Sequence, residues 1–149
     1  ARELRQRGIT VLTNQAVERG PIVIGGIADE VSEHDDVPAT WAAMDALPPR
    51  PRVLLTHGPD VVPDLPDRTI AAVFSGHTHC GQIVLPLVGA LSYSSRYGDR
   101  FACGRIDYEG LPVFVGAGMG TSIVPLRFGA PPSVWLVTLG PVAATEPVQ

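Results

Sequence analysis

Hydrophobic positions along the chain fall into short runs separated by turn-forming residues. Two early runs, residues 9–12 and 22–27, are rich in β-branched side chains and flank a Gly-Pro turn, which predicts two strands. Residues 38–47 instead place apolar side chains at spacings of three and precede two prolines. That pattern predicts a short helix with one face packed on a sheet.

Two later runs, residues 52–56 and 70–75, are almost continuously apolar. Such runs are typical of strands buried on both faces of an α/β sheet, and about a dozen residues between them allow a short crossover. Further strands are predicted at residues 83–85, 101–107, 113–115 and 134–139. We therefore expect an α/β fold over residues 1–139, followed by a flexible tail at residues 140–149.

The first residues, ARELRQRG, resemble the last turns of a helix, with Leu4 on its inner face and Gly8 ending it. No capping residue or first helical turn precedes Ala1. We therefore expect the chain to begin inside a larger domain.

The composition narrows the possible classes of function. The 149 residues are 45% apolar and 17% charged, enough for a packed core. A net charge of −4, without clustered Lys or Arg, argues against a nucleic-acid partner. No apolar run approaches the ~20 residues of a membrane helix.

Cys80 and Cys103 form no CxxC pair and no disulfide framework, which is compatible with a reducing compartment. We expect a cytoplasmic protein, or one peripheral to the membrane.

Three of the four histidines follow the two buried strands. His57 comes directly after residues 52–56, and His77 and His79 come shortly after residues 70–75. Residues two apart in extended chain project to the same side, and sites in open α/β sheets assemble where strands end. Imidazole is a good ligand for divalent ions such as Zn, Fe and Mn. We therefore predict a metal site at this edge, rather than three unrelated loop histidines.

The two histidine motifs together resemble those of a known family. An apolar strand ending in HGPD precedes, by some twenty residues, an apolar strand ending in SGHTHCGQ. This pairing looks like the last two metal motifs of the calcineurin-like metallophosphoesterases, and in particular of a bacterial branch that includes cell-envelope and lipid phosphoesterases. The other matching positions are Gly8-Ile9, Val11-Leu12, Asn14, Gly26, Asp29, Leu85-Pro86, 116–121, 125–128 and Pro131-Pro132.

The resemblance implies the C-terminal half of a layered α/β sandwich with mixed sheets. It also implies two divalent metal ions, Mn, Fe or Zn, with His57 and His77 on one and His79 on the other. In this family a hydroxide held by the metals attacks phosphorus in a mono- or diester or a pyrophosphate bond. The expected substrate is a phosphoester, for example a lipid or nucleotide-linked phosphate.

Several motifs of the family have no counterpart in the chain. These are an Asp-x-His pair, a Gly-Asp with the bridging carboxylate, and an Asn-His-Asp-like segment with the catalytic His. We expect them upstream of Ala1, so this chain should contain no catalytic residue and be inactive alone. Any membrane contact would come through that missing N-terminal part.

Four further residues are candidates for the outer contacts of the metals or the pocket wall. Asp60 could orient an imidazole or cap the next short helix, and Asp29 could line the pocket or serve a turn. Cys80, where the family often has Gly, could contact a metal or be a small buried residue. Arg127 could bind substrate phosphate or form a structural salt bridge.

Two other classes of function stay open. A mononuclear zinc hydrolase would use all three histidines on one ion, with water in the fourth position. A non-catalytic truncated piece or interaction module would instead expose apolar sheet edges and hold no metal.

Overall fold

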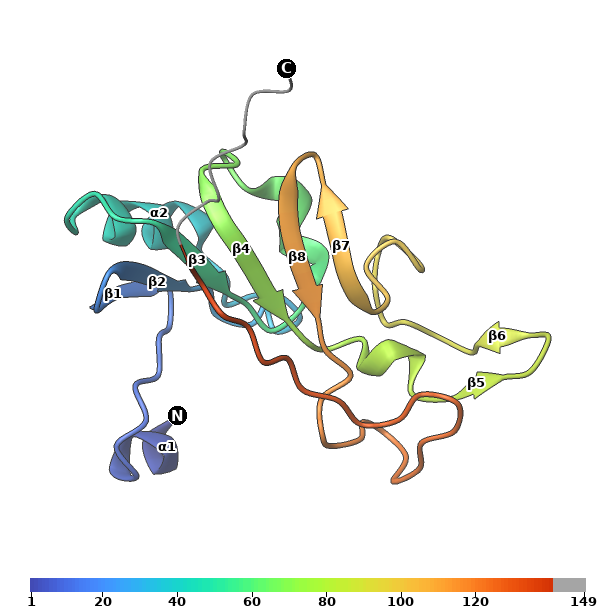
Figure 1. The fold of residues 1–149 in the computed structure, drawn as a ribbon. Helices are drawn as coiled ribbons and strands as arrows, with labels where there is room; N and C mark the ends of the chain where they lie inside the picture. The colour runs from blue at the N-terminus through green and yellow to red at the C-terminus, as the bar shows by residue number, and fades with distance from the viewer. Residues whose placement is uncertain (141–149) are drawn as a thin grey trace, which may run out of the picture.

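The computed structural model describes residues 1–140, and its centre is a six-stranded mixed sheet in the order β1-β2-β3-β4-β8-β7 (Figure 1). The four inner strands run parallel, and each edge strand is antiparallel to its neighbour. The strands are β1 (Gln15–Arg19), β2 (Ile22–Gly26), β3 (Arg52–Leu55), β4 (Ile70–Ser75), β7 (Gly104–Tyr108) and β8 (Leu111–Val115). A separate hairpin pairs β5 (Val84–Leu85) with β6 (Gly89–Ala90).

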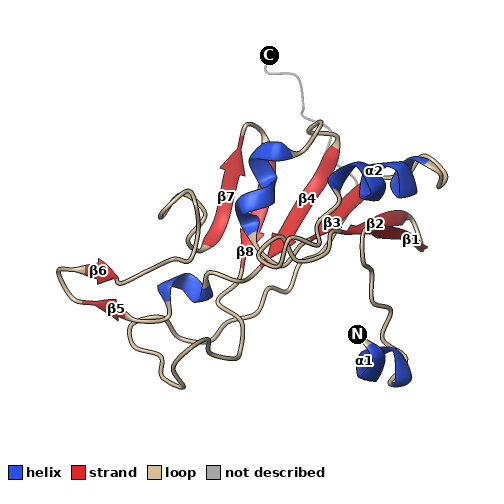
Figure 2. Cartoon of the chain, turned by 180° about the vertical axis from the view of Figure 1, so that it is seen from behind, coloured by secondary structure: helices blue, strands red, loops and turns tan. Residues whose placement is uncertain are grey.

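One face of the sheet is covered by α2 (Val37–Asp45) and by the 3₁₀ helix η1 (Pro59–Asp64), as Figure 2 shows. The Asp36 side chain caps α2 by accepting a hydrogen bond from the backbone N–H of Ala39 at 2.8 Å. Helix α2 lies so close to β2 that a Cβ at Gly25 would come within 2.7 Å of Met44 Sδ. Glycine at this position therefore allows α2 to pack directly against the sheet.

The hydrophobic core lies mostly between this face and the covering helices. Val23, Leu54, Val73 and Val113 come from the parallel strands β2, β3, β4 and β8 and are fully buried. Their β-branched and apolar side chains explain why these four segments form the inner strands. The two remaining helices are short: α1 (Arg2–Gln6), which has no buried residue, and η2 (His79–Gly81).

The α/β class predicted from the sequence is confirmed, and most predicted elements lie within a few residues of the observed ones. Two predicted strands are wrong. Residues 9–12 pair with no described strand, and their apolar side chains instead line a hollow with Ile24 and Leu55. Residues 134–139 cross the opposite face of the sheet as irregular chain (Figure 1), where Trp135 packs on Phe114 at 5.2 Å between ring centroids.

The expected tail covers residues 140–149, of which residues 141–149 lie outside the described part of the chain. Within residues 1–140, no helix combines the length and the apolar character needed to cross a bilayer.

Shortening a buried side chain of β3 should lower the free energy of unfolding. Leu54→Ala should lower the free energy of unfolding by about 2–5 kcal/mol, because a fully buried side chain leaves a cavity between the sheet and its helices. Arg105→Ala, at an exposed position of β7, should change it by less than about 0.5 kcal/mol. Urea unfolding of both variants measures the difference, and equal stabilities would contradict this assignment of the core.

Candidate metal centre

Parallel pairing of β3 and β4 brings His57 and His77 to the same edge of the sheet. Each histidine lies two residues beyond the last residue of its strand. A hydrogen bond from the backbone N–H of Gly76 to the carbonyl of His57, 2.9 Å long, ties the two connections together. Two side chains 20 residues apart in sequence are thus held side by side.

The two imidazoles meet through one nitrogen each. His57 Nε2 lies 3.0 Å from His77 Nδ1, with ring centroids 4.8 Å apart and planes at 61°. When two nitrogens bind the same cation at about 2.0–2.1 Å, with a tetrahedral or octahedral angle between them, they lie about 2.9–3.3 Å apart. The same distance also suits a hydrogen bond between a protonated and an unprotonated nitrogen. The distance between the two nitrogens is therefore compatible with a shared divalent ion as well as with a hydrogen bond.

The contact of His77 Nε2 determines whether the Nδ1 of His77 is free to bind a cation. His77 Nε2 lies 2.9 Å from the carbonyl oxygen of Ser94, and a carbonyl can only accept a hydrogen bond. In the neutral ring, Nε2 therefore carries the proton, and the Nδ1 lone pair faces His57.

His79 directs its Nδ1 toward the loop that follows β8. That nitrogen lies 3.1 Å from the carbonyl oxygen of Ala117 and 3.2 Å from Nη2 of Arg127. When the carbonyl accepts Nδ1–H, Nε2 keeps its lone pair for a cation. His77 and His79 border one small cavity of about 180 Å³. Across residues 1–140, however, no three His, Cys, Asp or Glu side chains converge on one point where an ion would fit.

Asp29 and Glu30 bring carboxylates close to His57. Asp29 Oδ1 lies 3.9 Å from His57 Nε2, so Asp29 borders the site while also accepting turn hydrogen bonds from Ser32 and Val31. The Ser32 hydroxyl does most to lower the pKa of Asp29, helped by Val31 and the nearby His57, although partial burial opposes the shift. Glu30 accepts from the backbone N–H of Gly58 at 3.2 Å. Sequence reasoning missed Glu30, whose only signal was its place after Asp29.

Asp60 neither contacts His57 nor caps a helix. It is 7% exposed, and its two carboxylate oxygens accept from the Ser95 hydroxyl and the Arg96 backbone N–H, both at 2.6 Å. The N-cap of η1 is Gly58 instead. Burial disfavours the charged guanidinium of Arg96, but the hydrogen bond to Asp64 and nearby negative charge raise its pKa.

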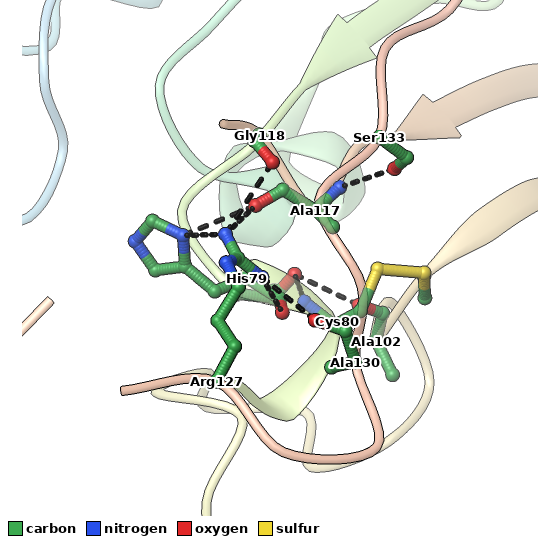
Figure 3. Close-up of a disulfide and its surroundings, with 10 residues drawn as sticks. His79, Cys80, Ala102, Ala117, Gly118, Arg127, Ala130 and Ser133 are labelled. Carbon is green, nitrogen blue, oxygen red and sulfur yellow. Dashed lines mark hydrogen bonds between the residues drawn. A yellow bond between two sulfur atoms is a disulfide. The ribbon is translucent and has the colours of Figure 1, made fainter. Parts of the chain in front are cut away.

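The structure corrects the prediction for the cysteines. Cys80 and Cys103 form a disulfide beside His79 (Figure 3). The turn around η2 lies next to the start of β7, where the two Cα atoms are 4.8 Å apart, and this proximity across 23 residues was not visible from spacing. Cys80 is therefore neither a free thiol nor a metal contact.

Among residues 1–140, the guanidinium of Arg127 contacts backbone carbonyls and no carboxylate. Its guanidinium donates to Ala117 at 2.6 Å and to the carbonyl of His79 at 3.2 Å, as Figure 3 shows. It also donates to the carbonyls of Gly118, Gly120 and Ala130. Of the two roles considered for Arg127, the structural one takes the form of carbonyl contacts that hold the loop after β8 around His79, and phosphate binding stays a prediction.

Gln82, the last residue of the SGHTHCGQ motif, was not predicted as a site residue, although it lies in the motif itself. Its buried amide donates to the carbonyls of Ser122 and Val124 and accepts from the Ser122 N–H at 2.6 Å. It fastens the 122–124 segment, which lines the cavity beside His77 and His79.

The chain is similar to curated bacterial proteins. It is 30% identical to phosphodiesterase YaeI of Escherichia coli (strain K12) over 141 residues, which are 91% of this chain and 49% of that protein. It is 36% identical over 87 residues to an uncharacterized metallophosphoesterase, YkuE of Bacillus subtilis (strain 168), covering 58% of this chain and 30% of YkuE. A Helicobacter pylori metallophosphoesterase is 30% identical over 140 residues, 89% of this chain and 36% of that protein.

These relatives confirm the predicted family: the chain belongs to the calcineurin-like metallophosphoesterases. It spans about half, or less, of the length of the three relatives. No family model matches the chain, and no solved structure does.

The disulfide beside His79 should contribute measurably to stability. Cys103→Ser should lower the free energy of unfolding by about 3 kcal/mol, because a crosslink over 23 residues restricts the unfolded chain. Urea unfolding with and without dithiothreitol measures this. The reductant should lower the stability of the parent to that of the variant and leave the variant unchanged. A parent indifferent to reduction would contradict the crosslink.

Proposed function

We propose that the complete protein hydrolyses phosphoric mono- or diesters, or a pyrophosphate bond, with the help of divalent cations that His57, His77 and His79 help to hold. Family membership supports a phosphoester substrate and the use of metal ions. The observation that carries the proposal is the 3.0 Å approach of His57 Nε2 to His77 Nδ1, with Nδ1 left unprotonated by the Ser94 contact.

The donor set divides the histidines between two cations. His57 Nε2 and His77 Nδ1 suit one ion, and His79 Nε2 suits a second when the Nδ1–H of His79 donates to the Ala117 carbonyl. Imidazole donors are compatible with Mn, Fe or Zn. When bound, such ions would acidify water and neutralise charge on the phosphoryl oxygens.

Three neutral imidazoles do not balance the charge of two dications, so carboxylate ligands are also required. Asp29 is close, but at 3.9 Å from His57 Nε2 it is positioned to add negative charge rather than to complete the set. We therefore propose that this chain forms one wall of the centre, that carboxylates and a catalytic histidine come from residues outside it, and that it has little activity alone.

The chain's own groups also shape the substrate side of the cavity. Leu91, Ile123 and Val124 line the cavity bordered by His77 and His79. These side chains favour an apolar alcohol group over a charged one, so we propose an ester such as a lipid phosphate ahead of a nucleotide-linked one.

The mononuclear zinc alternative has less support. It needs three imidazoles on one ion, whereas within residues 1–140 only the His57 and His77 rings approach each other closely enough to share one.

The histidines can be tested by substitution in the complete protein. His77→Ala and His79→Ala should each lower kcat/KM for Mn²⁺-dependent hydrolysis of an aryl phosphodiester by more than about a hundredfold, since even outer contacts of a metal site are worth about 10–100-fold. His34→Ala is the matched control, because His34 lies in an exposed loop and its ring contacts Ser32. Unchanged turnover in the first two variants would end the assignment of His77 and His79 as ligands.

A further inference from the structure

Asp60 holds a loop that comes from a distant part of the sequence. Its side chain is 10% exposed, and both oxygens accept short hydrogen bonds from residues 95 and 96, more than thirty positions further along the chain. The backbone carbonyl of Asp60 accepts a third bond, from Arg96 Nη2 at 2.9 Å. A buried carboxylate with two donors of this kind is a strong anchor, because removing it leaves both donors without a partner.

The anchored loop presents a carbonyl to His77. Ser94 directly precedes the two anchored residues and has φ +51°, a left-handed conformation that is uncommon for serine. The Ser95 hydroxyl also accepts from the Tyr97 N–H at 3.0 Å, which closes the turn. In this conformation the Ser94 carbonyl lies 2.9 Å from His77 Nε2.

We infer that Asp60 is a positioning residue that fixes the tautomer of His77 through the carbonyl of Ser94. Without the anchor, the carbonyl would lose its place, and the His77 proton would be free to move to Nδ1, the nitrogen that faces His57. The use of this arrangement for metal binding rests on the proposed function; the link from Asp60 to the tautomer does not.

Other roles for Asp60 account for less of the geometry. A helix cap is excluded because Gly58 is the N-cap of η1, which has no side-chain cap bond. A simple ion pair with Arg96 is served better by Asp64, whose Oδ2 lies 3.3 Å from Nη2, than by Asp60 Oδ2, which lies 3.8 Å from Nε. Asp60 differs from Asp64 in accepting hydrogen bonds from the Ser95 hydroxyl and the Arg96 backbone N–H, directly after Ser94.

The chain offers a matched control. Asp64 lies on the same 3₁₀ helix, is 61% exposed at its side chain, and pairs with the guanidinium of Arg96. Asp64→Asn removes a comparable charge while leaving the Ser94 turn in place. Ser95→Ala complements Asp60→Ala, because it removes the hydroxyl bonds to Asp60 and Tyr97 but keeps the carboxylate and its bond from the Arg96 N–H.

The test uses the complete, metal-free protein labelled with ¹⁵N-histidine, in which long-range ¹H–¹⁵N spectra report the tautomer of each ring. His77 should be protonated at Nε2 in the parent and in Asp64→Asn, and should populate the Nδ1–H form in Asp60→Ala and, to a smaller extent, in Ser95→Ala. Mn²⁺ titration should show affinity about tenfold weaker in Asp60→Ala and within about twofold of the parent in Asp64→Asn.

The inference is overturned if His77 keeps its Nε2 proton in both Asp60→Ala and Ser95→Ala, or if Asp64→Asn shifts the tautomer as strongly. A tautomer change in Asp60→Ala, in a protein whose parent binds no Mn²⁺, would keep the positioning role and reject the proposed function. The two claims can therefore fail separately.

Discussion

Parallel pairing of β3 with β4 is the constraint on which the rest of the site depends. It places the ends of two sequence-distant strands at one edge and brings His57 and His77, each two residues beyond its strand, to 3.0 Å between facing nitrogens. The buried apolar residues of both strands stabilise that register, since a slip of one residue would turn core side chains toward the other face. The packing of the core thus determines how His57 and His77 lie relative to each other.

Around this pair, the chain controls its imidazoles through their outward-facing nitrogens. His77 is held by the carbonyl of Ser94 and His79 faces the carbonyl of Ala117. Each carbonyl is in turn held by a charged side chain, Asp60 through the neighbouring residues or Arg127 directly. Backbone oxygens therefore set the direction in which each ring presents its lone pair. The disulfide adds a covalent restraint on the His79 turn.

Much of this was accessible from the sequence, and the failures have physical causes. Apolar runs identified β3 and β4 because burial on both faces leaves a direct pattern, and the histidines after them identified the edge. Residues 134–139 carry the same apolar signal but cover the sheet without joining it, which composition alone cannot distinguish. The Cys80 disulfide, the carbonyl contacts of Arg127 and the anchor at Asp60 depend on distant segments meeting in space. No local pattern reveals such contacts.

The most direct test of the account is anomalous diffraction from crystals of the complete protein grown with Mn²⁺. We expect an anomalous peak within bonding distance of both His57 Nε2 and His77 Nδ1, while His77 Nε2 stays hydrogen-bonded to the Ser94 carbonyl. A manganese ion bound elsewhere, or bound to His77 through Nε2 with the Ser94 contact broken, would contradict it.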